Sequence, residues 1–451
     1  MALRRDLGTT GVRPGGSVGV APPVTPNLAP RPELTAARRV GRNTLETILF
    51  RGVSTPLAML FVVVQSRLLA PEGRGEFVVV VLGATIVSRL LGQLGVAVTS
   101  RLRSSGESVA GLTQRALLLG VVLGAVGAPA MAAITVGSGQ VAATPAIVGA
   151  LGIVPNVLWQ TVSGVLLGRG RLRLWNVIQL LPPLLALVTL LVLVAGLDTG
   201  VTGALAGWAL ANLLTAAFAL VATRDLWRRR VRLRLLDRTS RALLRLAVLM
   251  GAVQVVNLVS YRAELFVLGR ERGNTAVGVY SIALQAVESM WLVPAAIATA
   301  VTAPVVAAPD DRRAAQLIAR SSLRALGLAT LIAGAVAAVA PFLIPAAFGK
   351  SFDDAVLPLE LLLPGVVVYA PVTVLVVYFS IRRAEPGWSL AVSVTSLLLT
   401  LGAALLLVPG HGPAGAAAGS SIGYAAGAAL AWAFFATIGR RARTLTATTP
   451  A

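Results

Sequence analysis

Residues 44–100 decide the fold, and they read TLETILFRGVSTPLAMLFVVVQSRLLAPEGRGEFVVVVLGATIVSRLLGQLGVAVTS. Two apolar runs, 44–68 and 75–98, flank a short turn that carries proline and glycine. Each run has the length of a transmembrane helix, which needs ~20 apolar residues. Each run also holds one internal arginine, Arg51 or Arg89. Because an arginine at the centre of a membrane helix costs at least about 2.5 kcal/mol, we interpret both arginines as residues with a specific role.

Similar apolar runs continue along the whole chain of 451 residues, of which 56% are hydrophobic. A soluble domain has roughly 45–50% apolar residues and rarely repeats runs of this length. The pattern therefore predicts an all-α polytopic membrane protein with about twelve transmembrane helices. We place them at 44–68, 75–98, 113–135, 144–167, 173–195, 201–222, 243–268, 276–303, 323–347, 357–381, 387–408 and 413–437.

The net charge is +21, and the basic residues lie mostly between the apolar runs, not on a separate basic domain. This placement argues against nucleic-acid binding. Arginine-rich connections alternate with connections of little net positive charge. Cytoplasmic loops carry the excess of basic residues, so both termini are expected in the cytoplasm. The basic connection 223–242 is also expected to contact anionic membrane lipids. With a composition typical of GC-rich bacteria, these features predict a multi-pass protein of the bacterial cytoplasmic membrane.

The same basic connection divides the spans into two halves of six. The halves look like weak repeats, because Gly75-Glu76-Phe77-Val78 in the first matches Gly278-Val279-Tyr280-Ser281 in the second. Both halves start on the same side, which predicts an axis of symmetry along the membrane normal. The expected parts are a disordered basic cytoplasmic tail (1–42), an N-terminal six-helix lobe (43–222), a basic cytoplasmic linker (223–242), a C-terminal six-helix lobe (243–438) and a cytoplasmic tail (439–451).

Polar side chains within the first two spans line up on one face of each helix. Arg51 and Gln65 share a face of the first span, and Arg89 and Gln93 share a face of the second. Arg51 and Arg89 lie at similar depth from the cytoplasmic side, so their guanidinium groups repel each other unless an anion is near. Arginine binds phosphate bidentately, which favours a cavity that receives phosphate groups. The alternatives are that the arginines snorkel to the headgroups or pair with an internal carboxylate.

The seventh and eighth spans carry the other polar faces. Gln254, Asn257 and Glu264 share one face, and Gln285 and Glu288 share another. Glu288 is expected near the midplane, where an unpaired charge is most costly, so it is a candidate for an ion-coupling site, a proton carrier or the partner of an arginine. Glu264 is expected nearer the outer surface, either in the cavity or at the interface. The tryptophans at positions 175, 208, 291, 388 and 432 are interpreted mostly as belt residues.

Several kinds of chemistry have no sequence signature here. The chain has no cysteine, and its single histidine, His411, lies in a turn, so no metal site and no cofactor are expected. The sequence also has no P-loop, no GxSxG element with triad partners and no HExxH motif. We therefore expect neither an ATP-driven pump nor an enzyme.

The order and spacing of three segments resemble a known family. They are Ser66-Arg67-Leu68-Leu69-Ala70-Pro71-Glu72-Gly73-Arg74-Gly75-Glu76-Phe77, Val277-Gly278-Val279-Tyr280 and Gly168-Arg169-Gly170-Arg171-Leu172-Arg173. Over about residues 44–440 the chain resembles the Wzx-like polysaccharide flippases of the multidrug/oligosaccharidyl-lipid/polysaccharide (MOP) superfamily. The resemblance implies two six-helix lobes around a central cavity, lined by the first, second, seventh and eighth spans. One departure is that Gln254 and Leu292 stand at the places equivalent to Arg51 and Arg89.

The resemblance implies a secondary transporter that flips an undecaprenyl-diphosphate-linked oligosaccharide by alternating access. Arg51 and Arg89 would then hold the diphosphate, and Glu288 and Glu264 would couple transport to H⁺ or Na⁺. Hydrogen bonds to sugar hydroxyls would come from Gln65, Gln93, Gln254, Asn257 and Gln285. A polysaccharide polymerase or glycosyltransferase is an expected partner.

Three rival functions remain open. A cation-coupled multidrug exporter of the same superfamily would favour an acidic, aromatic cavity, which two arginines oppose. A membrane glycosyltransferase would need a large outer loop, and no expected outer loop exceeds about ten residues. A scaffold for cell-wall assembly, without transport, is the third alternative.

Overall fold

The computed structural model describes residues 32–102, 108–228 and 237–447. The chain divides into two units, Met1–Glu46 and Thr47–Ala451, and the second unit contains nearly all of the helical structure. The described residues are helical almost throughout and contain no strand. This confirms the all-α membrane fold that the apolar runs predict.

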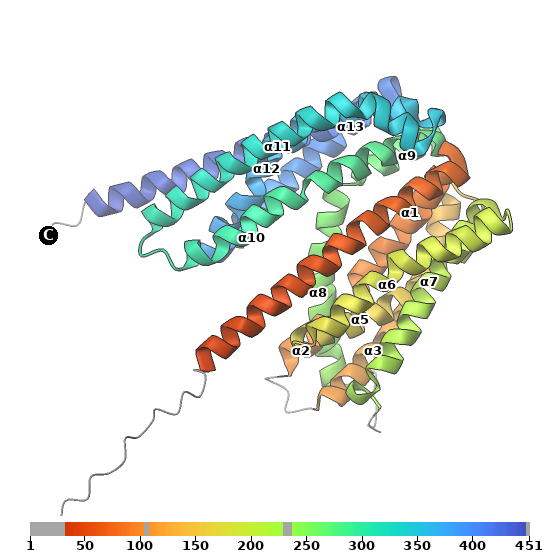
Figure 1. Cartoon of the computed structure of the whole chain (residues 1–451), viewed down its shortest axis with the longest axis horizontal. Coiled ribbons are helices and arrows are strands. Elements are labelled where there is room, and N and C mark those ends of the chain that lie inside the picture. The colour runs from red at the N-terminus through yellow and green to blue at the C-terminus, as the bar shows by residue number, and fades with distance from the viewer. Residues whose placement is uncertain (1–31, 103–107, 229–236, 448–451) are drawn as a thin grey trace, which may run out of the picture. The chain divides into compact units, whose positions relative to one another are not determined.

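The helices follow one another with short connections (Figure 1). The first half contains α1 (Pro32–Leu91), α2 (Leu94–Arg101), α3 (Val109–Gly137), α4 (Ala143–Ala150), α5 (Ile153–Gly168), α6 (Leu172–Leu190), η1 (Leu191–Gly196), α7 (Gly200–Ala222) and η2 (Arg224–Leu226). The second half contains α8 (Arg238–Ser260), α9 (Ala263–Met290), α10 (Leu292–Val306), α11 (Asp311–Phe348), η3 (Lys350–Ala355), α12 (Val356–Val376), η4 (Val377–Arg382) and α13 (Pro386–Ala447).

Three long helices contain a single non-helical residue at which the chain turns back. These residues are Ala70 (φ 55°, ψ 178°) in α1, Gly273 (φ 76°, ψ −176°) in α9 and Gly412 (φ 55°, ψ −130°) in α13. The residue before a proline avoids the helical region, which explains the break before Pro71. A positive φ costs an alanine about 1–2 kcal/mol, whereas glycine adopts it freely.

Ten helices in the described part of the chain are long and apolar enough to cross a membrane. Division at Ala70, Gly273 and Gly412, with α8 and the start of α9 as one pass, gives the twelve passes expected from the sequence. We number them 1 to 12. Pass 1 ends at Ala70, pass 2 runs from there through α2, pass 7 is α8 with α9 up to Gly273, and pass 8 is the rest of α9 with α10.

The helices of each half pack mainly on one another. In the first half α5 contacts α2, α3 and α7, and in the second α12 contacts α9, α11 and α13. Figure 1 also shows α10, α11 and α12 running along one another. The start of α8 is an exception, because Leu243 and Ala247 lie in the core of the first half. Two helical lobes are therefore joined through α8.

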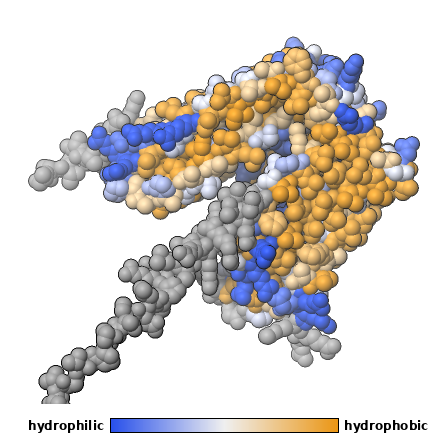
Figure 2. Space-filling view, in the orientation of Figure 1, coloured by the Kyte–Doolittle hydropathy of each residue, from blue (hydrophilic) through white to orange (hydrophobic). Residues whose placement is uncertain are grey.

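Large apolar side chains cover the outside of the lobes. Leu184 and Val188 of α6 and Leu213 and Phe218 of α7 are exposed. Figure 2 shows a broad apolar flank where these helices lie, and hydrophilic residues gathered near helix ends. In water such a surface would be unfavourable, whereas a bilayer solvates it. The chain is therefore a multi-pass membrane protein.

Helix bounds differ in places from the expected parts of the chain. Helix α1 begins at Pro32, within the segment expected to be a disordered tail, and α8 begins at Arg238, within the expected linker. Helix α13 continues to Ala447. Residues 1–31 and 229–236 lie outside the described residues, so the expectations for them remain predictions.

The predicted repeat is visible in the backbone. Ala70 and Gly273 have matching positive φ values, and each is followed by a helix whose fifth residue is glycine, Gly75 or Gly278. A Cβ atom at Gly75 would lie 1.8 Å from the carbonyl oxygen of Asn274. A Cβ atom at Gly278 would lie 1.8 Å from the carbonyl oxygen of Pro71. Passes 2 and 8 thus touch through equivalent residues, as two repeats related by symmetry would.

Small residues also bring passes 11 and 12 together. A Cβ atom at Gly423 would lie 2.0 Å from the Thr400 hydroxyl oxygen, and one at Gly427 would lie 1.9 Å from that of Ser396. Glycine lets helix backbones approach closely in membranes, where van der Waals packing drives association. The glycines that recur every four residues in the last span, Gly415, Gly419, Gly423 and Gly427, therefore include residues at which the two helices pack closely.

Candidate functional site

Of the two internal arginines in the first two spans, only Arg89 has a side chain that the structure describes. The side chain of Arg51 lies outside the described residues. Arg89 lies in the last turn of α1 with an exposed side chain, and it makes no hydrogen bond or ion pair with any described residue. Next to it, a Cβ atom at Gly251 of α8 would lie 2.1 Å from the Leu90 carbonyl oxygen. Arg89 is thus a cation without a partner among residues 32–102, 108–228 and 237–447, and it lies beside a contact between the two lobes.

Four of the five predicted amides are also without hydrogen bonds to described residues. Asn257 is exposed, and the other three are half-buried. They come from the break after α1 and from passes 7 and 8, and they are Gln93, Gln254, Asn257 and Gln285. A partly exposed amide in hydrocarbon would leave its donors and acceptors unsatisfied, so a polar or aqueous space beside these passes is favoured.

Gln65 has a different environment, which the sequence did not reveal. It is only 1% exposed, and its Oε1 accepts a hydrogen bond of 2.9 Å from Nη1 of Arg74. Arg74, itself 3% exposed, donates from Nε to Oγ of Ser281 at 2.8 Å. In this conformation Gln65 therefore helps to hold a buried arginine and is not available to a ligand. Arg74 lies in a connection of little net positive charge, where an arginine is unexpected. This is the one sequence signal that could have identified it.

Further contacts join the lobes at the end where passes 1 and 7 turn into passes 2 and 8. Nε of Arg67 donates to the Ala347 carbonyl oxygen of α11 at 2.7 Å. Nδ2 of Asn274 donates to the Gln140 carbonyl oxygen, between α3 and α4, at 2.6 Å. We call these two hydrogen bonds, the Arg74–Ser281 bond and the two glycine contacts the turn-side seal. Each component links one lobe to the other, so the lobes are closed against each other at this end.

Glu264 of α9 is a fully buried carboxylate in the second lobe. Its side chain is 0% exposed, and Oε1 accepts a hydrogen bond of 3.2 Å from the hydroxyl of Tyr280. That hydroxyl also lies 3.4 Å from Oγ of Ser420 in α13. Oε2 has no hydrogen-bond partner among the described residues. A buried carboxylate with a free oxygen is unfavourable unless it holds a proton or a cation, and Glu264 is equipped to bind either.

Glu288 pairs with an arginine, which is one of the three roles expected for it from the sequence. It forms an ion pair with Arg262, which directly precedes α9. The side chains are 33% and 25% exposed respectively. The pair has no net charge, but both charged groups are partly exposed. Water-filled surroundings stabilise such groups better than lipid does.

Four aromatic rings pack against one another, and two of them, Tyr261 and Trp291, lie close to this ion pair in the sequence. The ring centroids of Tyr261 and Trp291 are 6.3 Å apart, those of Trp291 and Tyr369 5.7 Å, and those of Tyr369 and Tyr424 5.4 Å. We call Tyr261, Trp291, Tyr369 and Tyr424 the aromatic cluster. The interpretation of Trp291 as a belt residue is wrong, because its ring packs on tyrosines of three other passes. Only tertiary structure brings these rings together.

A pocket of about 620 Å³ opens along α10 and the end of pass 10. Its lining is mainly apolar, with the hydroxyls of two threonines. The lining residues are Ala298, Thr299, Thr302, Ala303, Val306, Ala307 and Val377. The volume falls in the range of small-molecule sites, roughly 300–1,000 Å³.

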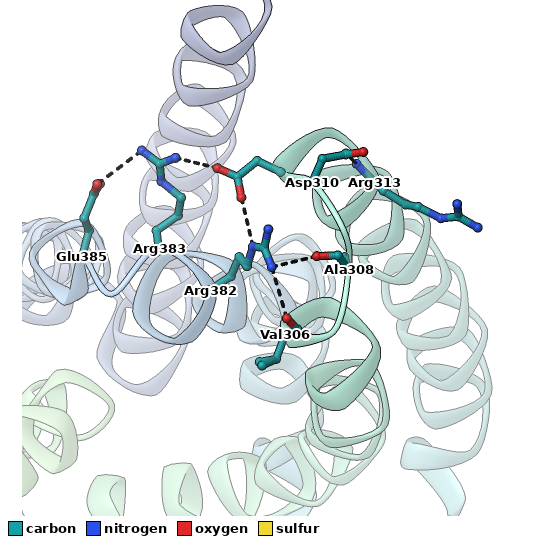
Figure 3. A network of polar contacts seen from close by, with 8 residues as sticks. Val306, Ala308, Asp310, Arg313, Arg382, Arg383 and Glu385 are labelled. Atoms are coloured by element: carbon teal, nitrogen blue, oxygen red, sulfur yellow. Dashed lines mark hydrogen bonds and ion pairs between the residues drawn. The ribbon is translucent and has the colours of Figure 1, made fainter. Parts of the chain in front are cut away.

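A network of charges closes the end of the second lobe beyond that pocket (Figure 3). Asp311 accepts hydrogen bonds from Arg382 Nε at 2.9 Å and from Arg383 Nη1 at 2.8 Å. Arg382 also donates to the carbonyl oxygens of Val306 at 3.1 Å and Ala308 at 3.0 Å. The network therefore ties the connection after pass 8 to the connection after pass 10.

Replacing Asp311 with alanine is expected to destabilise the second lobe. Arg382 would keep a partly buried positive charge without a carboxylate and Arg383 would retain only Glu385, which costs about 1–3 kcal/mol. The apparent melting temperature of the purified protein should fall by several degrees in a fluorescence-based thermal unfolding assay. Asp354→Ala, at an exposed aspartate of η3, is the matched control and should leave it unchanged. Equal melting temperatures for both variants would show that the network does not contribute to stability.

A profile of the family described as "Polysaccharide biosynthesis protein" matches residues 40–308, more than half of the chain. The chain belongs to this polysaccharide biosynthesis protein family. The match covers the first lobe and passes 7 and 8, so it includes Arg89, Glu264, Glu288 and the turn-side seal up to Ser281. A search of curated proteins finds no match.

Solved structures share the fold of this family member. An inward-facing multidrug resistance MATE family transporter of the MOP superfamily superposes with a TM-score of 0.72 at 20% identity, covering 88% of this chain and 96% of that one. The lipid II flippase MurJ, in an inward closed conformation, gives a TM-score of 0.72 at 10% identity, covering 90% and 94%. A MOP superfamily transporter from Pyrococcus furiosus, with a binding pocket of reversed polarity, gives 0.61 at 19% identity, covering 90% and 96%.

These matches confirm the resemblance drawn from the sequence. The chain is a multi-pass member of the polysaccharide biosynthesis protein family, and it has the two-lobe fold of the MOP superfamily transporters and flippases that it matches in structure. The proteins that it matches in structure are transporters and flippases, not enzymes.

Proposed function

We propose that this protein flips a lipid-linked oligosaccharide, carried on an undecaprenyl-diphosphate type of lipid, across the bacterial cytoplasmic membrane by alternating access. The observation that carries the proposal is Arg89, an exposed guanidinium within a membrane pass that pairs with no residue in the described part of the chain. Such a charge is costly in lipid and favourable beside water and an anion. The family to which the chain belongs is one of polysaccharide biosynthesis.

The proposed substrate combines three parts, each suited to a different kind of surface. The diphosphate carries negative charge, which Arg89 and Arg51 would bind bidentately. The glycan carries hydroxyl groups, for which Gln93, Gln254 and Gln285 have free amide donors and acceptors. The polyprenyl chain would remain in the bilayer, since its burial in a polar space is unfavourable.

We further propose that the described conformation faces the cytoplasm, with the turn-side seal on the outer side. The alternation of basic connections supports this orientation, with both termini in the cytoplasm. The TM-scores are compatible with it, since the inward-facing transporter gives 0.72 and an outward-facing one 0.62. Flipping would then require the Arg67, Arg74 and Asn274 hydrogen bonds to break and the opposite end to close.

Energy for the proposed cycle would come from a cation bound at Glu264. Its buried carboxylate has a free oxygen, and Tyr280 and Ser420 connect it to passes 8 and 12. Binding of H⁺ or Na⁺ would remove the cost of a buried charge and so bias one arrangement of these passes. Glu288 is less suited to this role, because Arg262 already neutralises it.

A multidrug exporter is the second candidate, and the aromatic cluster beside Glu264 favours it. Organic cations bind to aromatic faces and carboxylates. The two functions differ in the expected effect of Arg89→Glu. An exporter of organic cations should keep or gain ethidium efflux from cells, whereas a flippase should lose glycan export.

The proposed function is tested by depleting the protein in its native cells and measuring lipid-linked glycans in each leaflet. Accumulation of one precursor on the inner face, reversed by the wild-type gene, is the expected result. An unchanged distribution of all lipid-linked glycans would overturn the proposal. The same experiment separates a flippase from a scaffold for assembly, since loss of a scaffold would leave precursors able to cross.

A further inference from the structure

We propose that Tyr261 and Trp291, together with the Arg262–Glu288 pair, form a subsite for the sugar rings of the substrate. This inference rests on the proposed function, and it identifies the surface that binds the glycan. Two of the four rings in the aromatic cluster are accessible to a ligand. Tyr261 is 37% exposed and Trp291 half-buried, whereas Tyr369 and Tyr424 are buried at 5% and 3%.

The buried tyrosines fix the two accessible rings in place. Tyr424 lies 6.2 Å from Tyr261 and 6.3 Å from Trp291, measured between ring centroids. Tyr369 meets Trp291 edge to face at 5.7 Å and an interplanar angle of 90°. Because the buried tyrosines already fix the rings of Tyr261 and Trp291, these two rings lose little conformational entropy when a ligand covers them. The apolar faces of a sugar ring suit such a rigid aromatic surface, and its hydroxyls stay at the rim.

The ion pair supplies the polar rim. Arg262 follows Tyr261 directly, and Glu288 lies one helical turn before Trp291. Both charged side chains are partly exposed, so the guanidinium can donate to sugar hydroxyls and the carboxylate can accept from them. Hydrogen bonds to charged groups are stronger than neutral ones and depend on direction. The subsite therefore recognises the pattern of hydroxyls as well as the ring.

The pocket on α10 extends the same surface. Trp291 directly precedes α10, and Ala298 and Thr302 lie seven and eleven residues further on, which places them on the same helix face. The pocket begins roughly 10 Å from Trp291 along the helix axis. Its 620 Å³ has room for the next sugar residues of a longer glycan, and the hydroxyls of Thr299 and Thr302, which donate to their own helix backbone, can accept hydrogen bonds from them. In the proposed arrangement, a longer oligosaccharide would extend from the aromatic cluster along pass 8 toward this pocket.

The test compares two probes with the purified protein in lipid nanodiscs: undecaprenyl diphosphate, and the same lipid carrying a disaccharide. Native mass spectrometry gives the affinity for each. We expect the wild type to bind the disaccharide probe about tenfold more tightly than the bare lipid, a difference of about 1.4 kcal/mol. Tyr261→Ala should remove most of that difference without changing the affinity for the bare lipid, and Tyr261→Phe should keep it.

Phe266→Ala is the matched control, because Phe266 is an exposed aromatic residue of the same pass and 41% accessible. It should retain the full preference for the disaccharide probe, and so should any variant that is merely less stable yet folded. If Tyr261→Ala kept the preference, or if the wild type bound both probes equally, the subsite would be refuted while the proposed function stood. If neither probe bound, the proposed function would fall as well.

Discussion

Glutamine in place of Glu264 is expected to abolish the uphill component of transport while the protein still folds. Glutamine has nearly the same shape and can keep the hydrogen bond with Tyr280, but it can neither take up a proton nor neutralise a cation. A cation that crosses a potential of 100 mV supplies about 2.3 kcal/mol, which corresponds to a leaflet ratio of about fiftyfold. Proteoliposomes with an imposed H⁺ or Na⁺ gradient measure this ratio for a fluorescent lipid-linked glycan.

The matched control for that experiment is Glu360→Gln, at an exposed glutamate of α12. This variant should respond to the gradient as the wild type does. The gradient that drives the wild type, H⁺ or Na⁺, identifies the coupling ion. Full gradient-driven accumulation by Glu264→Gln would exclude Glu264 from coupling and leave Glu288, paired with Arg262, as the remaining candidate.

The second large effect is expected from an alanine at Gly278. Its Cβ atom would lie 1.8 Å from the Pro71 carbonyl oxygen, and that oxygen belongs to the backbone and cannot move aside alone. Passes 2 and 8 must therefore separate at the turn-side seal, which favours the conformation open to the outside. Flipping should fall by about tenfold or more, since a shift of 1.4 kcal/mol between the two conformations already changes their ratio tenfold.

Accessibility to a thiol reagent reports this opening directly, because the protein has no native cysteine. Gln285→Cys places one thiol on pass 8 beyond the seal, and a membrane-impermeant maleimide is added from outside. Labelling should be slow with Gly278 and fast with Gly278→Ala. The control Gly327→Ala adds a Cβ that meets nothing within 4 Å, so it should leave labelling slow. Equally slow labelling in all three would mean that the seal tolerates the methyl group.

The fold was predictable because its main signals are local. Long apolar runs separated by arginine-rich or turn-forming segments specify the membrane passes without knowledge of their neighbours. The matching turns at Ala70 and Gly273 could also be read, since proline and glycine punctuate the sequence there. The close packing of the last two passes was likewise predictable from their regularly spaced glycines.

The site was predictable only in part, because it depends on contacts across the chain. Sequence position placed Arg89, Gln254 and Gln285 on polar faces, and their side chains are without partners among the described residues. It could not show that Gln65 is committed to Arg74, or that Glu288 meets Arg262. Those pairings join residues from different passes, and periodicity along one helix carries no information about them. The aromatic cluster was missed for the same reason.

The most direct measurement of the central claim uses the purified protein in liposomes with an undecaprenyl-diphosphate-linked disaccharide labelled for leaflet detection. The wild type should move the probe between leaflets, Arg89→Lys should retain part of the rate, and Arg89→Ala should lower it about tenfold or more, since hydrogen bonds to a charged group are worth roughly 1.5–3 kcal/mol. An Arg89→Ala protein that flips the probe at the wild-type rate would contradict the account.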